Sequence, residues 1–245
     1  MLDERRASEP SDKDILSQLL AFRDENGQGL SDEQLRDQTI TLFLAGHETV
    51  ALTMNWTWHL LLEHPDIYAR MLEEVSTVLG SRTPTAEDLA RLPFTLQVLK
   101  ESMRIQPSSY IVARSPRQDV TVQGYPLKKG DLILISNFLL HRNEELFAQP
   151  DKFIPERFSP ENEKQRPRSS YMPFGAGAKI CIGNHFAMQE AHLLLAVMAQ
   201  RVRFEALPGH AVRAVPGPSL RPTDYQARVH VRHDVRQPQR LSSVG

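Results

Sequence analysis

One cysteine lies in a setting that suits a metal-bound thiolate. Cys181 is the only cysteine among 245 residues, and it lies in the run FGAGAKICIG at 174–183. A lone cysteine is most often an inert, small hydrophobic side chain. A thiolate ligand, however, needs backbone N–H groups and a helix N-terminus near the sulfur, and glycine lets the backbone come that close. Because helical periodicity resumes at Ala187, this setting favours a metal ligand over an inert thiol.

A second group of residues has the chemistry to handle protons. The sequence Ala45-Gly46-His47-Glu48-Thr49 lies within 31–64, a stretch with no proline and no other glycine. Inside a helix, Gly46 costs about 1 kcal/mol relative to alanine. Thr49 can bond a carbonyl one turn back and open a kink that holds water, while Glu48 supplies an acid. The ordinary alternative is a tolerated glycine and a core threonine.

Several charged residues have spacings that carry little information alone. Glu101 and Arg104 share a helical face, and Arg157 follows in a Pro-Glu-Arg-Phe sequence. Alone, the first two indicate a surface ion pair. Arg114 precedes Asp119 by five positions in a segment with a strand pattern. The histidines show no metal-ligand spacing, so we expect no second metal site.

The cysteine run resembles the haem-ligand loop of the cytochrome P-450 family. Phe174, Gly177, Cys181 and Gly183 fit that loop, spacing included, and the resemblance implies that Cys181 is the iron ligand. Lys179 stands where the family usually has arginine or histidine to bind a haem propionate. It keeps the positive charge but loses the planar fork of arginine.

The remaining motifs occur in the family's order. Residues 45–49 resemble its oxygen-activation segment, which implies that Gly46 lies against the haem and that Glu48 and Thr49 guide protons. Val50 stands where the family commonly has a second hydroxyl residue. Arg114 matches a propionate-binding arginine on a strand.

Two further matches imply structural roles. Glu101, Arg104 and Arg157 match the family's Glu-Arg-Arg triad, a buried network that pins the loop carrying the cysteine. His141-Arg142 fits a common family dipeptide, which we interpret as a loop-packing contact.

The resemblance implies a haem-thiolate monooxygenase that activates dioxygen and oxidises, typically hydroxylates, an apolar organic substrate. Its cofactor would be haem b, with electrons from NAD(P)H through a separate ferredoxin or flavoprotein reductase, because no flavin or iron-sulfur motif is present. Substrate contacts are expected from Phe43 and Leu44, from Tyr110 to Val112, and from Pro218 to Leu220.

The elements that must position these residues are mainly helices with small sheets. Apolar periodicity and capping signals predict five helices, from Ser11 to near Asn26, Ser31 to His64, Pro65 to Gly80, Phe94 to Ile105 and Ala187 to Arg201. The second of these would be about 50 Å long. Thr85 and Asp88 form a capping box before a short helical turn. We expect the long helix to pass through the interior. Alternating β-branched residues predict short strands over 108–136 and after Val202. Residues 143–180 form a long loop of the kind that is usually functional or disordered, and the cysteine run that follows favours a functional one.

Composition excludes several classes of protein. The 29 basic and 30 acidic residues nearly cancel, so we expect no nucleic-acid or acidic-membrane partner. A single cysteine excludes an intrachain disulfide. No signal peptide or membrane-length apolar stretch is evident, so we expect a soluble, cytoplasmic chain.

The resemblance extends from Ser11 to about His233 but covers only the second half of the family's fold. We therefore expect residues 1–245 to form the C-terminal part of a cytochrome P-450 domain, with the N-terminal half absent. The alternative is a truncated fragment that binds haem weakly and catalyses nothing. Expressed alone, the chain is expected to hold haem weakly and to show little or no monooxygenase turnover. A haem-thiolate isomerase or peroxide-using relative is disfavoured by the Glu48-Thr49 pair.

Overall fold

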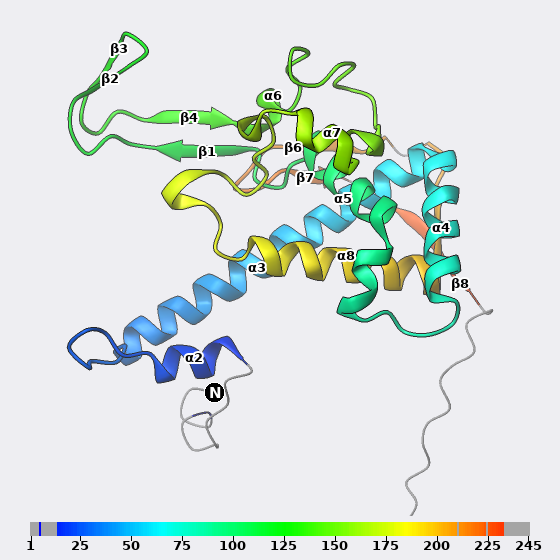
Figure 1. Ribbon diagram of the computed structural model, residues 1–245, viewed down its shortest axis with the longest axis horizontal. Helices are drawn as coiled ribbons and strands as arrows, with labels where there is room; N and C mark the ends of the chain where they lie inside the picture. Colours follow the sequence, from blue (N-terminus) through cyan, green and yellow to red (C-terminus); the bar gives the residue numbers. More distant parts are fainter. Residues whose placement is uncertain (1–4, 6–13, 210, 224, 233–245) are drawn as a thin grey trace, which may run out of the picture. The chain divides into compact units, whose positions relative to one another are not determined.

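The computed structural model describes residues 5, 14–209, 211–223 and 225–232. Residues Met1–Glu48 and Thr49–Gly245 form two compact units, which are described separately. The long helix α3 (Asp32–Glu63) contributes to both. The described chain is mainly helical with four two-stranded sheets (Figure 1), which confirms the expected fold class.

The first unit contains α2 (Ile15–Ala21) and the first half of α3. The Asp14 carboxylate caps α2 by accepting a hydrogen bond from the Ser17 amide at 2.9 Å. The cap expected at Ser11 lies outside the described residues. α3 begins with a reciprocal capping box, because the Ser31 amide donates to the Gln34 side chain at 2.9 Å and the Gln34 amide donates to the Ser31 hydroxyl at 3.2 Å.

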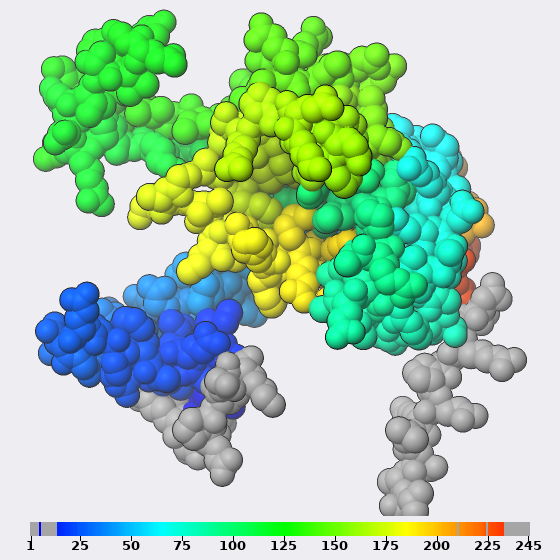
Figure 2. All heavy atoms as spheres, viewed as in Figure 1, coloured from blue at the N-terminus to red at the C-terminus, as the bar shows by residue number. Residues whose placement is uncertain are grey.

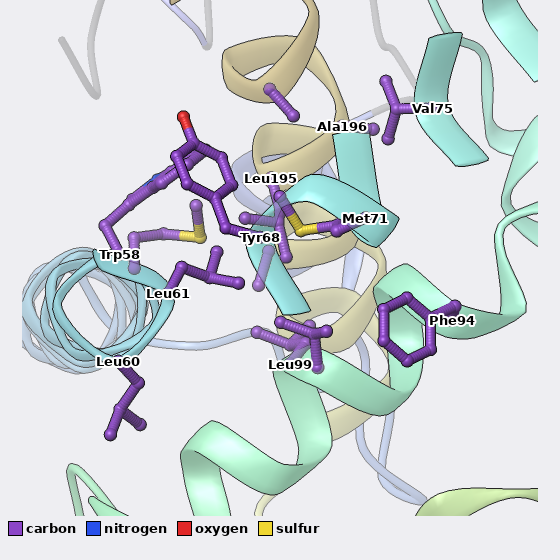
Figure 3. Packing of buried hydrophobic residues seen from close by; sticks show 14 of the residues in the cluster. Trp58, Leu60, Leu61, Tyr68, Met71, Val75, Phe94, Leu99, Leu195 and Ala196 are labelled. Carbon is purple, nitrogen blue, oxygen red and sulfur yellow. The ribbon is translucent and has the colours of Figure 1, made fainter. Parts of the chain in front are cut away.

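The second unit is built on a helical core. The second half of α3 packs with α4 (Pro65–Leu79), α5 (Pro93–Ile105) and α8 (Asn184–Arg201). Figure 3 shows Leu61 of α3 facing Met71, Leu99 and Leu195, while Leu60 points away from this group. Burial of these aliphatic side chains stabilises the unit by the hydrophobic effect.

Short elements connect the core helices. The expected capping box at Thr85 and Asp88 is present and begins the short 3-10 helix η1 (Ala86–Arg91). Between α5 and α8 the chain forms five more short helices: α6 (Asn137–Leu140), η2 (Pro155–Phe158), α7 (Pro160–Gln165), η3 (Arg168–Ser170) and η4 (Gly177–Lys179).

All four sheets are antiparallel pairs in the second unit. β1 (Ile111–Arg114) pairs with β4 (Ile133–Ser136), and the hairpin of β2 (Val120–Val122) and β3 (Tyr125–Leu127) lies between them in sequence. The hairpin turn has positive φ at both Gln123 (48°) and Gly124 (86°), as a two-residue turn between twisted strands requires. β5 (Val202–Ala206) pairs with β8 (Ala227–Val231), and β6 (Arg213–Val215) with β7 (Arg221–Thr223).

The expectation that the whole of α3 is interior holds only for its second half. Trp56 and Leu61 are fully buried, whereas Phe43 and Leu44 are mostly exposed. The difference follows from packing within the second unit, because the buried cluster formed with α4, α5 and α8 includes residues of α3 from Val50 onward.

Candidate functional site

The segment around the cysteine, residues 172–183, forms a tight turn that we call the Cys181 loop. The Phe174 carbonyl accepts a hydrogen bond from the Cys181 amide at 3.0 Å, and the Met172 carbonyl accepts one from the Gly175 amide at 3.0 Å. Gly175 and Gly177 have φ of +74° and +71°, a region that costs L-residues roughly 1–2 kcal/mol. Glycine at these two positions therefore allows the turn that presents Cys181.

The loop leads directly into α8. Gly183 is the N-cap, and its carbonyl accepts from the Ala187 amide at 2.8 Å. The Cys181 side chain is exposed, and its sulfur lies 3.9 Å from the position of a Cβ built on Gly183. The N-terminus of a helix favours negative charge, so this position suits a thiolate. The 3.9 Å separation is ordinary van der Waals contact, so the cysteine sulfur alone does not require glycine at this position.

Exposed apolar side chains flank the thiol. Ile180 is 50% exposed, Phe186 67% and Ile182 91%. Exposure of apolar surface to water is unfavourable by about 25 cal/mol for each Å², so exposed apolar patches often mark binding sites. One segment thus exposes a thiol together with aliphatic and aromatic side chains. These fit a ligand that has both a metal able to bind thiolate and an apolar face, as haem does. Figure 2 shows this segment in yellow at the surface of the second unit, before α8.

Of the two cations expected to bind propionates, Lys179 is exposed and Arg114 is half-buried. Arg114 on β1 donates only to its neighbour, the Ala113 carbonyl, at 2.9 Å. Lys179 lies in η4, two residues before the cysteine. Neither forms an ion pair with a carboxylate in the part of the chain that the structure describes, so both can bind an acidic ligand.

The Glu-Arg-Arg residues form one buried network. Glu101 and Arg104 are fully buried on α5 and make two hydrogen bonds of 2.6 and 2.8 Å. Arg157 from η2 donates to the same carboxylate at 3.2 Å, and so does the Ile154 amide at 2.9 Å. Arg104 also donates to the carbonyls of His141 at 2.7 Å and of Lys152 at 3.1 Å. The network therefore fixes the long loop on α5, in the structural role that the sequence implied.

His141 makes the loop-packing contact expected of it. Its ring is fully buried between Tyr171 and Phe147, and its Nε2 accepts a hydrogen bond from the Met172 amide at 3.0 Å. Burial, together with the positive charges of nearby arginines, lowers the pKa of the imidazole to about 4. The ring is therefore neutral at physiological pH.

The proposed proton-handling residues lie at the boundary between the two units. Gly46 and Glu48 belong to the first unit and Thr49 begins the second. A Cβ built on Gly46 meets no atom within 4 Å, so packing within the described chain does not require glycine there.

The sequence alone did not reveal a hydroxyl ladder along α3, in which threonine hydroxyls donate to carbonyls four residues earlier, beginning at the Thr49 carbonyl. The Thr49 carbonyl accepts from the Thr53 hydroxyl at 2.9 Å, and the Thr53 carbonyl accepts from the Thr57 hydroxyl at 2.7 Å. The repeat of threonine every four residues was the available signal.

Two of the three expected substrate-contact segments lie together in the second unit. The Tyr110 hydroxyl donates to the Gly217 carbonyl at 3.0 Å, and the Leu220 amide donates to the Ser108 carbonyl at 3.0 Å. Leu220 itself is buried, and its carbonyl accepts from the Trp56 indole at 2.9 Å. Within residues 218–220, Pro218 is exposed and is therefore better placed than Leu220 to contact a ligand.

Comparisons with known proteins give a consistent result. The family model for cytochrome P450 matches residues 1–227. Cyclooctatin synthase of Streptomyces melanosporofaciens is 41% identical over 90% of this chain and 48% of its own length. Pentalenene oxygenase of Streptomyces avermitilis is 37% identical over 97% of this chain and 52% of its own length. The chain therefore spans about half the length of the curated relatives it matches.

Solved structures agree with the sequence relatives. The crystal structure of the cytochrome P450DA heme domain covers 95% of this chain with a TM-score of 0.89 and 32% identity, and 53% of that structure is matched. The retinoic acid-bound cyanobacterial CYP120A1 covers 94% with a TM-score of 0.89 and 35% identity, again with 53% of that structure matched. Among the residues that the structure describes, no helix is long and apolar enough to span a membrane.

Proposed function

This chain belongs to the cytochrome P450 family, and from that premise we propose that it carries the haem-thiolate site of a monooxygenase with Cys181 as the iron ligand. Membership implies a haem cofactor and oxidoreductase chemistry. The single observation that carries the ligand assignment is the Cys181 loop, which presents an exposed thiol at the N-terminus of α8 among exposed apolar side chains.

The chain's own residues divide the remaining tasks. Phe174, Gly177 and Gly183 shape the backbone around the thiolate. Lys179 and Arg114 would bind the two propionates of haem b, as cations without carboxylate partners among the described residues. When bound, haem supplies the redox chemistry with dioxygen.

We assign the protons to the 46–49 segment of α3, as the family resemblance implies. The missing side chain at Gly46 lets a flat ring approach the helix backbone, and the open space around its α-carbon supports this role. Glu48 and Thr49 hold and pass protons to the reacting oxygen, as a carboxyl and a hydroxyl on neighbouring positions can.

The substrate that we propose is an apolar small molecule. Phe43 and Leu44 are exposed on α3, and Tyr110 lies next to the 217–220 segment. Two relatives support the same class, since their names assign them pentalenene and cyclooctat-9-en-7-ol. Electrons come from NAD(P)H through a separate ferredoxin or flavoprotein reductase.

The test is oxidation of a defined probe. The chain, joined to the N-terminal half of the fold that its relatives have, is titrated with hemin and supplied with NADPH, ferredoxin and ferredoxin reductase. It is then incubated with pentalenene and with a panel of other apolar compounds. We expect a product that contains one additional oxygen atom from dioxygen, detected by mass spectrometry with ¹⁸O₂. Stoichiometric haem binding without any oxygenated product would contradict the monooxygenase assignment. Weak haem binding without product would support the alternative, a chain that keeps the motifs but not the catalysis.

A further inference from the structure

The hydrogen bond between His141 and Met172 joins two functional parts of the second unit. Met172 is the first residue of the Cys181 loop, and its amide donates to the His141 ring at 3.0 Å. The His141 carbonyl accepts from Arg104 of the buried network at 2.7 Å. His141 is thus bonded by its main chain to the Glu-Arg network and by its side chain to the cysteine loop.

The bond fixes the protonation state of the ring. A backbone N–H can only donate, so Nε2 must carry a lone pair and the proton of the neutral ring must be on Nδ1. Nδ1 is buried and has no hydrogen-bond partner within the described part of the chain. Protonation of Nε2 would place its N–H group against the N–H group of Met172, and the hydrogen bond between them would be lost.

Burial and the surrounding charges oppose protonation of the ring, and they outweigh a backbone interaction with Arg104 that raises its pKa. Arg104, Arg142 and Arg166 all place positive charge near the ring. The nearest carboxylate of the network, Glu101, is already shared by Arg104 and Arg157. Tyr171 packs on the ring with 5.3 Å between centroids, and burial raises the pKa of its hydroxyl well above the usual range, so it adds no negative charge.

The contact is also close to the turn that positions the sulfur. After Met172, the Phe174 carbonyl accepts from the Cys181 amide at 3.0 Å and the Met172 carbonyl accepts from Gly175 at 3.0 Å. A displacement of the Met172 backbone therefore disturbs both hydrogen bonds that close the loop.

From this geometry we propose that His141 is a positioning residue for the Cys181 loop: its neutral imidazole fixes the Met172 backbone, and protonation of the ring releases that backbone in acid. The contact is a property of the chain without its cofactor, whereas its consequence for iron ligation rests on the proposed function.

The first measurement uses the full chain without haem. Long-range ¹H–¹⁵N spectra report which ring nitrogen carries the proton. We expect the proton of His141 on Nδ1 at neutral pH, and the proton of His192 on Nε2, because that nitrogen bonds the Leu92 carbonyl at 3.1 Å. A proton on Nε2 of His141 would overturn the proposal.

The second measurement is the hydrogen-exchange protection of the Met172 amide, expressed relative to its intrinsic exchange rate. His141→Leu should lower protection by about tenfold, the equivalent of one hydrogen bond. His141→Gln, whose side-chain oxygen can accept but does not titrate, should restore it. In the wild type, acid should lower the protection of Met172 before that of Leu195 in the core, and His141→Gln should remove this early loss.

A matched control separates positioning from general stability. His192 is also buried, and burial lowers its pKa too. Its ring, however, bonds the carbonyl of Leu92, the N-cap of α5, and not the Cys181 loop. His192→Leu should leave the protection of Met172 unchanged relative to Leu195. Equal loss of Met172 protection in both leucine variants would show that His141 has only a general structural role.

The last measurement adds hemin and carbon monoxide to the reduced protein. The thiolate-type Soret band should weaken in His141→Leu and recover in His141→Gln. Unchanged spectra in both variants, with Met172 protection lost in His141→Leu, would overturn the positioning role. Absence of a thiolate-type band in the wild type would contradict the proposed function instead and leave the ring tautomer and the Met172 contact as measured.

Discussion

Glu48 and Thr49 are the residues to which the proposed function assigns the protons. The family's second hydroxyl position is Val50 in this chain, so the delivery of protons depends on one hydroxyl. Thr49 also begins the hydroxyl ladder of α3, since its carbonyl accepts from Thr53 at 2.9 Å. Thr49→Ala removes the hydroxyl and keeps this carbonyl.

In the protein joined to the N-terminal half of its relatives' fold, we expect Thr49→Ala to bind haem as the wild type does and to lower product formed per NADPH by about tenfold. The missing electrons should appear as hydrogen peroxide or water, measured by peroxide assay and oxygen uptake. Thr39→Ala is the matched control, because its hydroxyl bonds the Leu35 carbonyl at 2.7 Å on the same helix. Unchanged coupling in Thr49→Ala would show that protons take another route.

Gly46 gives a second prediction at the scale of one residue. A Cβ there meets no atom within 4 Å, so Gly46→Ala should raise the unfolding free energy of the chain without haem by about 1 kcal/mol. If the haem ring approaches the α3 backbone at Gly46, the same methyl group should weaken haem affinity by about tenfold.

Urea unfolding and hemin titration measure the two effects of Gly46→Ala. Gln38→Ala, an exposed change on the same helix, should change the unfolding free energy less and leave haem affinity alone. An alanine variant that is more stable and binds haem equally well would contradict the role proposed for Gly46.

Among the elements, the contact between α5 and the long loop depends on the buried Glu101–Arg104 pair. Removing one partner of a buried pair leaves an uncompensated charge, so we expect Glu101→Ala to lower the unfolding free energy by roughly 3–5 kcal/mol. The exposed pair of Arg70 and Glu156 is the control, and Arg70→Ala should cost less than about 1 kcal/mol. Equal effects of the two substitutions in chemical denaturation would contradict the structural role of the network.

The elements also show what a sequence can and cannot predict. Residues 31–64 lack proline and carry one glycine, so the helix found at Asp32–Glu63 was predictable to within a residue at each end. The capping box at Thr85 and Asp88 was predictable for the same reason, since its signal is local.

Long-range contacts were not predictable in this way. Trp56 and Leu220 are hydrogen-bonded although 164 residues separate them, and no local pattern relates them. His141 likewise required the fold, because its partner Met172 lies 31 residues away. The resemblance predicted which residues form the site, whereas only the structure shows that the thiol and its apolar neighbours are exposed.

For the whole molecule, His141 predicts how stability depends on pH. Its pKa is about 4 in the folded chain against an ordinary value of 6.5, so the unfolded chain binds the proton more readily. The contribution of His141 to the free energy of unfolding is therefore fully present above pH 6.5. It falls as the pH decreases towards 4 and is constant below that. The expected loss is roughly 3 kcal/mol.

Urea unfolding of the wild type and of His141→Gln across this pH range measures the effect. The difference between the two proteins isolates His141, because other titrating groups contribute to both. A difference in unfolding free energy that does not change with pH would contradict the buried, neutral state of the ring.

The central claim is that Cys181 is the iron ligand, and the reduced carbon monoxide complex of the full chain with haem tests it most directly. We predict the red-shifted Soret band of thiolate ligation in the wild type and its loss in Cys181→Ser, since no other cysteine is present. His185→Ala, which removes the exposed imidazole nearest in sequence to the cysteine, should retain the band. Retention of the band in Cys181→Ser, or its absence from the wild type while haem is bound, would contradict the account.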